Sequence, residues 1–424
     1  MDLSVVIPTL NEEKNIEKII PSIREEIFPA VNGAEIIVVD GGSKDRTREV
    51  AESLNAKVVL QDERGYGGAL IAGFAAAKGK YILTMDADLS HRPTFFHDMF
   101  EKMQDSDVVV ASRYVHGGSA TMPVFRKFLS IVLNQFFKRG LSLPIRDVSS
   151  GFRLYKTSAL RDMRILSRDF DVLEEILIKL YTGGYHIAEV PFQYEPRIEG
   201  QTHAKLIQFG IAYLKTFIRM WELRNSTSAA DHEERAYNST VLLQRWWQRR
   251  RCSIVADLTK DCQRTLDIGC GSSRILSSLP NPVGVDIMLN KLLYARKYGK
   301  RLVNATALNL PFKDSSFDCV VCSKVIEYLD DDQQPFDEMT RVLKADGILI
   351  VGTPDYSRST WIALEKIYRF IFPKKYAARY RTHYTRKKLA KRMISLGYEI
   401  LDVKYIFRSE MIFQLRKKNQ RMVG

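Results

Sequence analysis

The chain changes from apolar to acidic within Tyr81-Ile82-Leu83-Thr84-Met85-Asp86-Ala87-Asp88. The first five residues have the composition of a buried β-strand, and two carboxylates follow it one residue apart. Parallel sheets gather the carboxyl ends of their strands at one edge, where ligands bind. Paired carboxylates supply the oxygen ligands that Mg2+ and Mn2+ prefer. Alone, two acidic residues after a strand more often belong to a solvated loop than to a site, so the surrounding sequence has to decide.

Strand and helix patterns alternate on both sides of this stretch. Strands are expected over 5–8, 35–40, 57–60, 107–111 and 187–191, and helices over 46–54 and 67–78. Such alternation predicts a parallel sheet covered by helices on both faces.

The pattern restarts in the second half. A polar stretch, 225–234, is followed by a helix rich in Trp and Arg over 241–257 and a Gly-rich turn at Gly269-Cys270-Gly271. Further strands are expected to end at Asp286 and to cover 317–322 and 347–352. We therefore expect two α/β domains, 1–224 and 235–424, joined by a linker over 225–234.

The composition of the 424 residues, 45% hydrophobic and 27% charged, is typical of a globular protein. Five cysteines, all in the second half, argue against a disulfide scaffold and for a reducing compartment. Cys319 and Cys322 have the C-x-x-C spacing of a zinc ligand pair. Because they lie in an apolar run without a second pair, core cysteines are the favoured interpretation.

The formal net charge is +14, and residues 361–424 hold 17 Lys/Arg against 4 Asp/Glu. This region suits an anionic membrane surface or substrate, and a solvated basic face fits as well. The first residues read directly as a strand, so we expect no signal peptide. No apolar run reaches the length of a transmembrane helix, about 18 residues or more. We therefore expect a cytoplasmic, peripheral membrane protein.

Two apolar stretches with basic residues, 124–139 and 206–223, are expected to form helices. They could lie in the plane of a membrane surface or pack on the sheet. Their aromatic content and basic residues favour membrane contact.

The first half resembles family 2 glycosyltransferases of GT-A fold. The resemblance is carried by Pro8-Thr9-Leu10-Asn11-Glu12 and by residues 38–45, 64–69 and 85–91. Residues 111–114, 126–130 and 147–153 resemble the dolichyl-phosphate mannose synthase branch in particular.

This resemblance implies a nucleotide-sugar site whose residues are Pro8, Glu12, Asp40, Arg64, Asp86, Ala87 and Asp88. Asp86 and Asp88 would hold Mg2+ or Mn2+ against the diphosphate of a GDP- or UDP-hexose. Arg113 and Asp147 join these two carboxylates as the implied catalytic residues.

The resemblance further implies a polyprenyl phosphate acceptor, whose phosphate would be held by Arg113, Arg126, Ser130, Arg197 and Lys205. Attack on the anomeric carbon would invert its configuration. A phosphate acceptor needs no strong base. A sugar hydroxyl would need one, and Asp147 would be the candidate. The sequence leaves the sugar, the nucleotide and the choice of acceptor open.

The second half resembles class I S-adenosylmethionine-dependent methyltransferases of the type-11 kind, which have a Rossmann-like fold. The resemblance rests on residues 266–271, on Asp286 and on residues 310–322. It implies a cofactor site formed by Asp267, Gly269, Gly271, Asp286, Thr306 and Ala307, with S-adenosylmethionine as the methyl donor.

Together these features predict a bifunctional enzyme. One domain would transfer a hexose to a polyprenyl (dolichyl) phosphate at the cytoplasmic membrane face, and the other would methylate a glycan or lipid-linked intermediate. The alternative is a transferase acting on a sugar hydroxyl in polysaccharide or glycolipid synthesis, whose second domain is a non-catalytic membrane-binding module. No nucleic-acid partner is expected.

Overall fold

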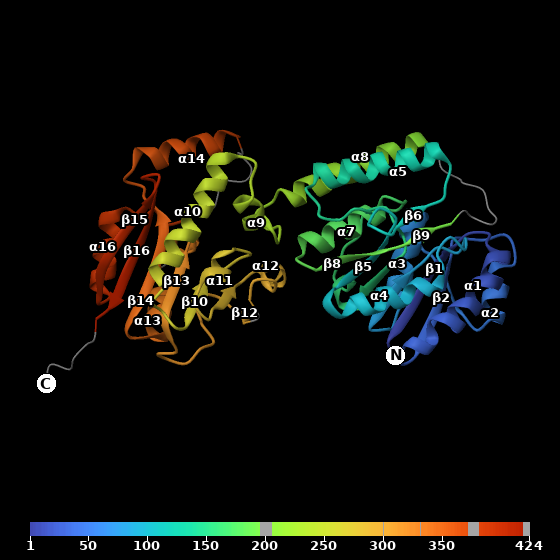
Figure 1. Ribbon diagram of the computed structural model, residues 1–424, viewed down its shortest axis with the longest axis horizontal. Helices are drawn as coiled ribbons and strands as arrows, with labels where there is room; N and C mark the ends of the chain where they lie inside the picture. The colour runs from blue at the N-terminus through green and yellow to red at the C-terminus, as the bar shows by residue number, and fades with distance from the viewer. Residues whose placement is uncertain (196–205, 300, 331, 372–380, 419–424) are drawn as a thin grey trace. The chain divides into compact units, whose positions relative to one another are not determined.

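The chain forms two compact units, Met1–Asn225 (unit 1) and Ser226–Gly424 (unit 2). The computed structural model (Figure 1) describes residues 1–195, 206–299, 301–330, 332–371 and 381–418.

Seven strands form the main sheet in the described part of unit 1. Their order is β3 (Lys57–Leu60), β2 (Ala34–Asp40), β1 (Leu3–Thr9), β4 (Tyr81–Thr84), β7 (Arg153–Lys156), β5 (Val108–Ser112) and β8 (Ile187–Pro191). Neighbouring strands pair parallel except at β7, which runs antiparallel to β4 and β5. The sheet is therefore mixed, whereas the sequence predicted a parallel sheet. The chain enters β7 from the loop at the carboxyl edge, so this strand runs away from that edge.

Alternate residues of β1 supply two separate cores, because successive side chains of a strand point to opposite faces. Val5 and Ile7 pack with α1 (Glu13–Glu26), α2 (Thr47–Ser53) and α4 (Phe96–Lys102). Val6 packs on the other face, whose helices are α3 (Tyr66–Ala76), α6 (Thr157–Leu160), α7 (Val172–Thr182), α5 (Val124–Gly140) and α8 (Leu206–Arg224). A two-stranded sheet, β6 (Ser119–Ala120) with β9 (Gln193–Tyr194), completes the unit.

The two apolar helices of unit 1, α5 and α8, lie side by side (Figure 1), with the rings of Phe136 and Phe217 4.3 Å apart. Both helices also keep large apolar side chains exposed: Val124, Phe125, Phe128, Ile131 and Val132 on α5, and Ile211, Leu214, Ile218 and Trp221 on α8. Each helix therefore packs through one face and leaves another uncovered in this unit. No helix in the described part of the chain combines the length and apolar character needed to cross a membrane.

Unit 2 is built on a second seven-stranded sheet within its described residues. The order is β12 (Leu302–Asn304), β11 (Val283–Asp286), β10 (Thr265–Ile268), β13 (Phe317–Ser323), β14 (Leu343–Pro354), β16 (Glu410–Lys417) and β15 (Tyr398–Ile406). The first five strands pair parallel, and β16 pairs antiparallel with both of its neighbours.

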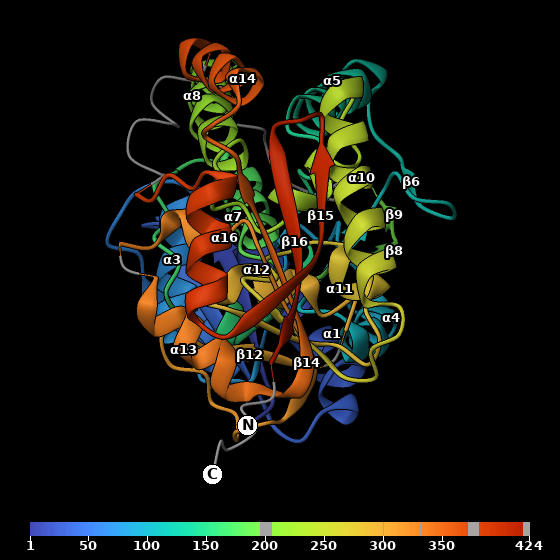
Figure 2. The same ribbon diagram turned by 90° about the vertical axis from the view of Figure 1, so that its left-hand side faces the viewer.

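Helices cover both faces of this sheet (Figure 2). One face packs α13 (Gln333–Val342) and α16 (Arg386–Ser395), and the other packs α10 (Leu242–Thr259) and α11 (Ile275–Ser278). Among its described residues, unit 2 also contains α9 (His232–Tyr237), α12 (Leu289–Ala295) and α14 (Ser359–Ile371).

The stretch 225–234, expected to be a linker, is almost wholly part of unit 2, which starts at Ser226. Ala229, Ala230 and Asp231 are buried, and α9 begins at His232. The side chains of Glu233 and Glu234 in this stretch form ion pairs within unit 2.

Arg153, the first residue of β7, is completely buried. Its guanidinium donates hydrogen bonds to the carbonyls of Ser150, Leu173 and Val148, each at 2.7 Å. These bonds fix the loop before β7 against α7. The neighbouring Glu174 is also buried. Burial raises its pKa to about 8, although the charge of Arg153 acts in the opposite direction.

Replacing Arg153 by Met should lower the stability of β7 in unit 1 by about 3 kcal/mol or more, because three buried carbonyls lose a charged donor. Hydrogen exchange of the amides of residues 153–156 measures this loss, and the amides of β10 in unit 2 should keep their protection. The exposed Arg161, replaced in the same way, is the control. Equal protection of β7 in both variants would contradict the assignment.

Candidate active sites

The parallel strands of unit 1 bring Asp40 and Asp86 to one edge of the sheet, as the sequence predicted. Asp40 is the last residue of β2 and is buried. Its carboxylate accepts hydrogen bonds from the backbone N–H groups of Gly42 and Ser43, both at about 3.1 Å. These bonds use part of its acceptor capacity to shape the loop after β2.

Asp86 follows β4, and its side chain is 29% exposed. Oδ1 accepts a hydrogen bond from the hydroxyl of Tyr66 at 2.9 Å. The backbone N–H of Asp86 donates to Nδ1 of His91 at 2.9 Å, while Nε2 lies 3.8 Å from Oδ2. Nδ1 acts as the acceptor, so a neutral His91 carries its proton on Nε2, facing the carboxylate. Asp86 is therefore oriented by two neighbours and still partly open.

No role was predicted for His91 from the sequence, although it lies within residues 85–91, which carry part of the resemblance to the glycosyltransferases. It is buried, and its ring stacks on Phe152 with centroids 4.9 Å apart. The edge of Phe192 packs against the same ring. Its position five residues after Asp86 is the signal that could have identified it.

Asp88 lies deeper than Asp86. It is 5% exposed, and its Oδ1 accepts hydrogen bonds from the backbone and the hydroxyl of Ser90. No group of three or more His, Cys, Asp or Glu side chains stands at metal-binding distance within the described ranges. The carboxylates of Asp86 and Asp88 suit a hard divalent cation that takes its other ligands from phosphate or water.

The remaining residues implied for the nucleotide sugar surround this edge. Pro8 is half-buried in β1, Ala87 is buried between the two aspartates, and Arg64 is exposed before α3. The carboxylate of Glu12 accepts a hydrogen bond from Asn15 at 2.6 Å.

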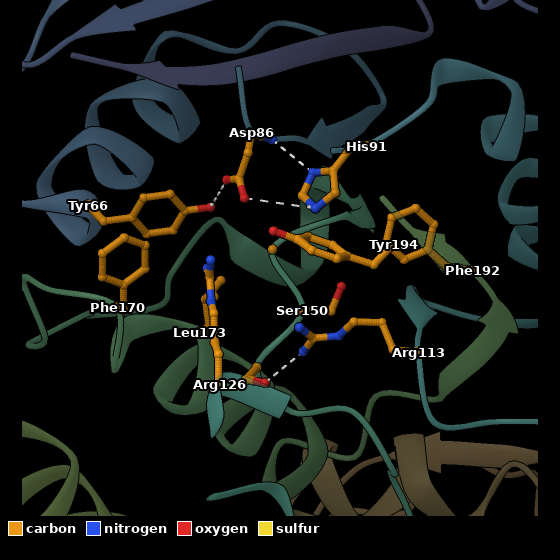
Figure 3. A pocket seen from close by; sticks show the side chains of 12 residues that line it. Tyr66, Asp86, His91, Arg113, Arg126, Ser150, Phe170, Leu173, Phe192 and Tyr194 are labelled. Atoms are coloured by element: carbon orange, nitrogen blue, oxygen red, sulfur yellow. Dashed lines mark hydrogen bonds and ion pairs between the residues drawn. The ribbon is translucent and has the colours of Figure 1, made fainter. Parts of the chain in front are cut away.

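A pocket of about 110 Å3 opens beside Asp86. Figure 3 shows Asp86, Tyr66 and His91 on one side of it, with Arg113 and Arg126 on the opposite side. The pocket wall needs a glycine at position 151, since a Cβ there would lie 2.8 Å from the hydroxyl of Tyr66.

Arg113 is fixed by Asp147. Its Nε and Nη2 donate to the two carboxylate oxygens at 2.8 and 2.7 Å, and Nη2 also reaches Ser149 Oγ at 2.8 Å. The backbone N–H of Arg113 donates to the same carboxylate at 3.0 Å.

The Asp147 side chain is completely buried. Burial would raise the pKa of Asp147, but the charge and hydrogen bonds of Arg113 outweigh it and hold the pKa below its ordinary value. This arrangement argues against Asp147 as a general base, because its carboxylate is already paired and holds protons weakly.

Arg126 and Ser130 lie on α5. Arg126 is exposed and lines the pocket, and Ser130 Oγ accepts a hydrogen bond from the hydroxyl of Tyr114 at 2.8 Å. Arg197 and Lys205, also predicted to hold the acceptor phosphate, lie outside the described residues.

In unit 2, the residues predicted for the cofactor meet at the carboxyl edge of the sheet. The carboxylate of Asp286 accepts hydrogen bonds from the backbone N–H groups of Gly271 and Met288, both at 2.8 Å. Gly271 has φ +53°. Because a glycine has no side chain, a cofactor can approach the backbone of Gly271 closely.

Two further features of this edge bear on the cofactor. Asp267 is buried in β10, where burial and then the charge of Asp286 raise its pKa to about 8. Thr306 and Ala307 are half-buried, and Thr306 Oγ1 accepts a hydrogen bond from the N–H of Leu308 at 3.2 Å. Gly271 and Asp286 thus fit a nucleoside cofactor.

Comparison with known proteins agrees with the two units. The family model for Glycosyl transferase family 2 matches residues 4–164, and a Methyltransferase domain model matches residues 266–351. Dolichol-phosphate mannosyltransferase of Pyrococcus furiosus is 35% identical over 217 residues, which cover 48% of this chain and 60% of that protein. Dolichyl-phosphate hexose transferase of Haloferax volcanii is 30% identical over 220 residues, covering 52% of this chain and 93% of that protein.

Among solved structures, glucosyl-3-phosphoglycerate synthase of Mycobacterium tuberculosis, in complex with Mn2+, UDP and glucosyl-3-phosphoglycerate, is similar to 52% of this chain. The match covers 80% of that protein, with 22% identity and a TM-score of 0.41.

Replacing Tyr66 by Phe should weaken binding of Mn2+ in the presence of GDP or UDP by roughly 10-fold, because Asp86 loses the donor that orients it. Titration of Mn2+ followed by electron paramagnetic resonance measures the change. Tyr114→Phe is the matched control, since it removes a hydroxyl that bonds Ser130 instead. Equal affinity in both variants would count against a metal at Asp86.

Proposed function

We propose that this chain, which belongs to glycosyl transferase family 2 through unit 1 and carries a methyltransferase domain in unit 2, is a bifunctional transferase. Unit 1 transfers a hexose from a nucleotide sugar to a polyprenyl phosphate, with inversion at the anomeric carbon. Unit 2 methylates a glycan or lipid-linked intermediate. The observation that carries the first activity is the pocket with Asp86 on one side and Arg113 and Arg126 on the other.

The acidic side of the pocket is the donor side. A divalent cation held by Asp86 and Asp88 would neutralise charge on the departing nucleoside diphosphate. The hydroxyl of Tyr66 donates a hydrogen bond to the Asp86 carboxylate, and the His91 ring accepts one from the backbone N–H of Asp86. Such support of a metal ligand is commonly as important as the ligand itself.

The basic side is the acceptor side. Guanidinium groups match phosphate oxygens in geometry and charge. Arg113 is positioned by Asp147, and Arg126 extends from the first turn of α5. A phosphate acceptor needs no base, whereas a hydroxyl acceptor does, and Asp147 is unsuited to that role. The names of two relatives, dolichol-phosphate mannosyltransferase of Pyrococcus furiosus and dolichyl-phosphate hexose transferase of Haloferax volcanii, support the same choice.

The polyprenyl chain of this acceptor would lie in the membrane. Arg126 lies between Phe125 and Phe128, which are 66% and 60% exposed. The exposed apolar side chains of α5 and α8 therefore suit insertion into the cytoplasmic membrane surface beside the acceptor phosphate, and their basic residues suit anionic lipid.

In unit 2, Gly269, Gly271 and Asp286 support S-adenosylmethionine as the methyl donor. Fusing the two activities in one chain raises the local concentration of the first product near the second domain. Neither of the two proposed activities uses a nucleic acid as substrate or partner.

Incubation of the full chain with GDP- and UDP-hexoses, polyprenyl phosphate and Mn2+ should give a lipid-linked sugar detectable by mass spectrometry. Asp86→Asn should lower the rate by roughly 100-fold or more, because the donor side loses the charge that holds the metal. Failure of every donor, or efficient transfer to a sugar hydroxyl in preference to the phosphate, would contradict the proposal.

Phe128→Ser should weaken sedimentation of the protein with vesicles of phosphatidylglycerol and phosphatidylcholine, because one large apolar side chain no longer enters the membrane. Leu60→Ser, which removes an equally exposed apolar side chain from β3, is the control. The same vesicle binding by both variants would count against α5 as the docking surface.

A further inference from the structure

The first residues of unit 2 form a strap over the Gly-rich turn. We use this name for residues 226–237, which end with α9. The carbonyl of Ser228 accepts a hydrogen bond from Asn290 Nδ2 at 2.6 Å. The carboxylate of Glu234 pairs with Arg274 at 2.7 Å and also accepts a hydrogen bond from the hydroxyl of Tyr298. The strap is therefore fastened to the elements after β10 and β11.

Between these anchors, Glu233 points its carboxylate at the turn. Oε2 accepts a hydrogen bond from the hydroxyl of Ser272 at 2.5 Å, and Oε1 pairs with the ammonium group of Lys291. A Cβ placed on Gly271 would lie 3.3 Å from the carboxyl carbon of Glu233. The carboxylate therefore stands against the glycine face that the cofactor has to approach.

The environment keeps Glu233 ionised. Burial would raise the pKa of Glu233, but the charges of Lys291 and His232 and its hydrogen bonds outweigh burial, so the pKa lies below its ordinary value. Glu233 thus presents an anionic carboxylate at neutral pH, held by one hydroxyl and one ammonium group.

S-adenosylmethionine also carries a carboxylate, at its methionine end. Ser272 and Lys291 offer that group a hydroxyl donor and a positive charge beside the turn. We propose that Glu233 is a built-in competitor for the cofactor, because its carboxylate takes the place of the methionine carboxylate on Ser272 and Lys291. Cofactor binding then requires the strap to release this contact. The inference rests on the proposed use of S-adenosylmethionine by unit 2.

Calorimetric titration of the full chain with S-adenosylhomocysteine, which keeps the methionine carboxylate, tests the proposal. Glu233→Ala should bind it about 10-fold more tightly than the unmodified chain, since no internal carboxylate competes. Glu233→Gln, which keeps the size of the side chain and removes its charge, should show a gain in the same direction. Glu222→Ala removes an exposed carboxylate from α8 and should leave the affinity unchanged.

Two further titrations test whether Glu233 competes with the methionine carboxylate of the cofactor. Adenosine, which lacks the carboxylate, should bind Glu233→Ala and the unmodified chain equally well. Lys291→Ala should weaken binding of S-adenosylhomocysteine, and in that background Glu233→Ala should give a smaller gain.

Equal or weaker binding of S-adenosylhomocysteine by Glu233→Ala would overturn the proposal, and weaker binding would make Glu233 a cofactor ligand instead. An equal gain for adenosine would also overturn it, because the strap would then block the whole site. If neither the unmodified chain nor Glu233→Ala binds at millimolar concentration, the proposed cofactor fails together with the inference.

Discussion

Parallel strand pairing is the constraint on which both candidate sites depend. Pairing of β1 with β2 and β4 in unit 1, and of β10 with β11 and β13 in unit 2, places the carboxyl ends of the central strands together. Residues distant in sequence, such as Asp40 and Asp86, therefore reach one edge without any direct bond between them. The same arrangement brings Asp286 to the backbone of Gly271 at 2.8 Å. The sheet thus determines where each site lies, and the loops at its edge carry further residues of the site.

Buried charges then decide what each edge can do. In unit 1, the ion pair of Arg113 and Asp147 fixes a guanidinium group at the pocket. Because the carboxylate of Asp147 is paired, it is poorly suited to act as a general base. This favours an acceptor that is already anionic. In unit 2, the pair of Glu233 and Lys291 places a carboxylate beside the turn where a cofactor would lie. The buried pair of Arg113 and Asp147 is costly to break from one side, because the remaining charge is left buried without its partner.

The sequence predicted the features that depend on local pattern. These include the central strands, the position of Asp86 after β4, the glycine turn, and two α/β domains whose families the comparisons confirm. Features that depend on long-range pairing were missed. Arg153 begins β7 with a charged residue, so the strand was not recognised. Asp147 is the candidate base for a hydroxyl acceptor, and its pairing with Arg113, 34 residues away, cannot be read from the local sequence pattern. The hydrogen bond between Ser272 and Glu233, 39 residues apart, is likewise not visible in the local sequence pattern. The metal and the role of each site residue stay predictions.

The central claim is that Asp86 marks the donor side of the pocket and the arginines mark the acceptor side. The most direct measurement is anomalous diffraction from crystals of the full chain grown with Mn2+ and GDP or UDP. We expect a manganese peak bound by the carboxylate of Asp86, with the diphosphate on the metal and with Arg126, across the pocket, free to bind the acceptor. A bound nucleotide whose manganese lies away from Asp86, or whose diphosphate sits on Arg113 and Arg126, would contradict it.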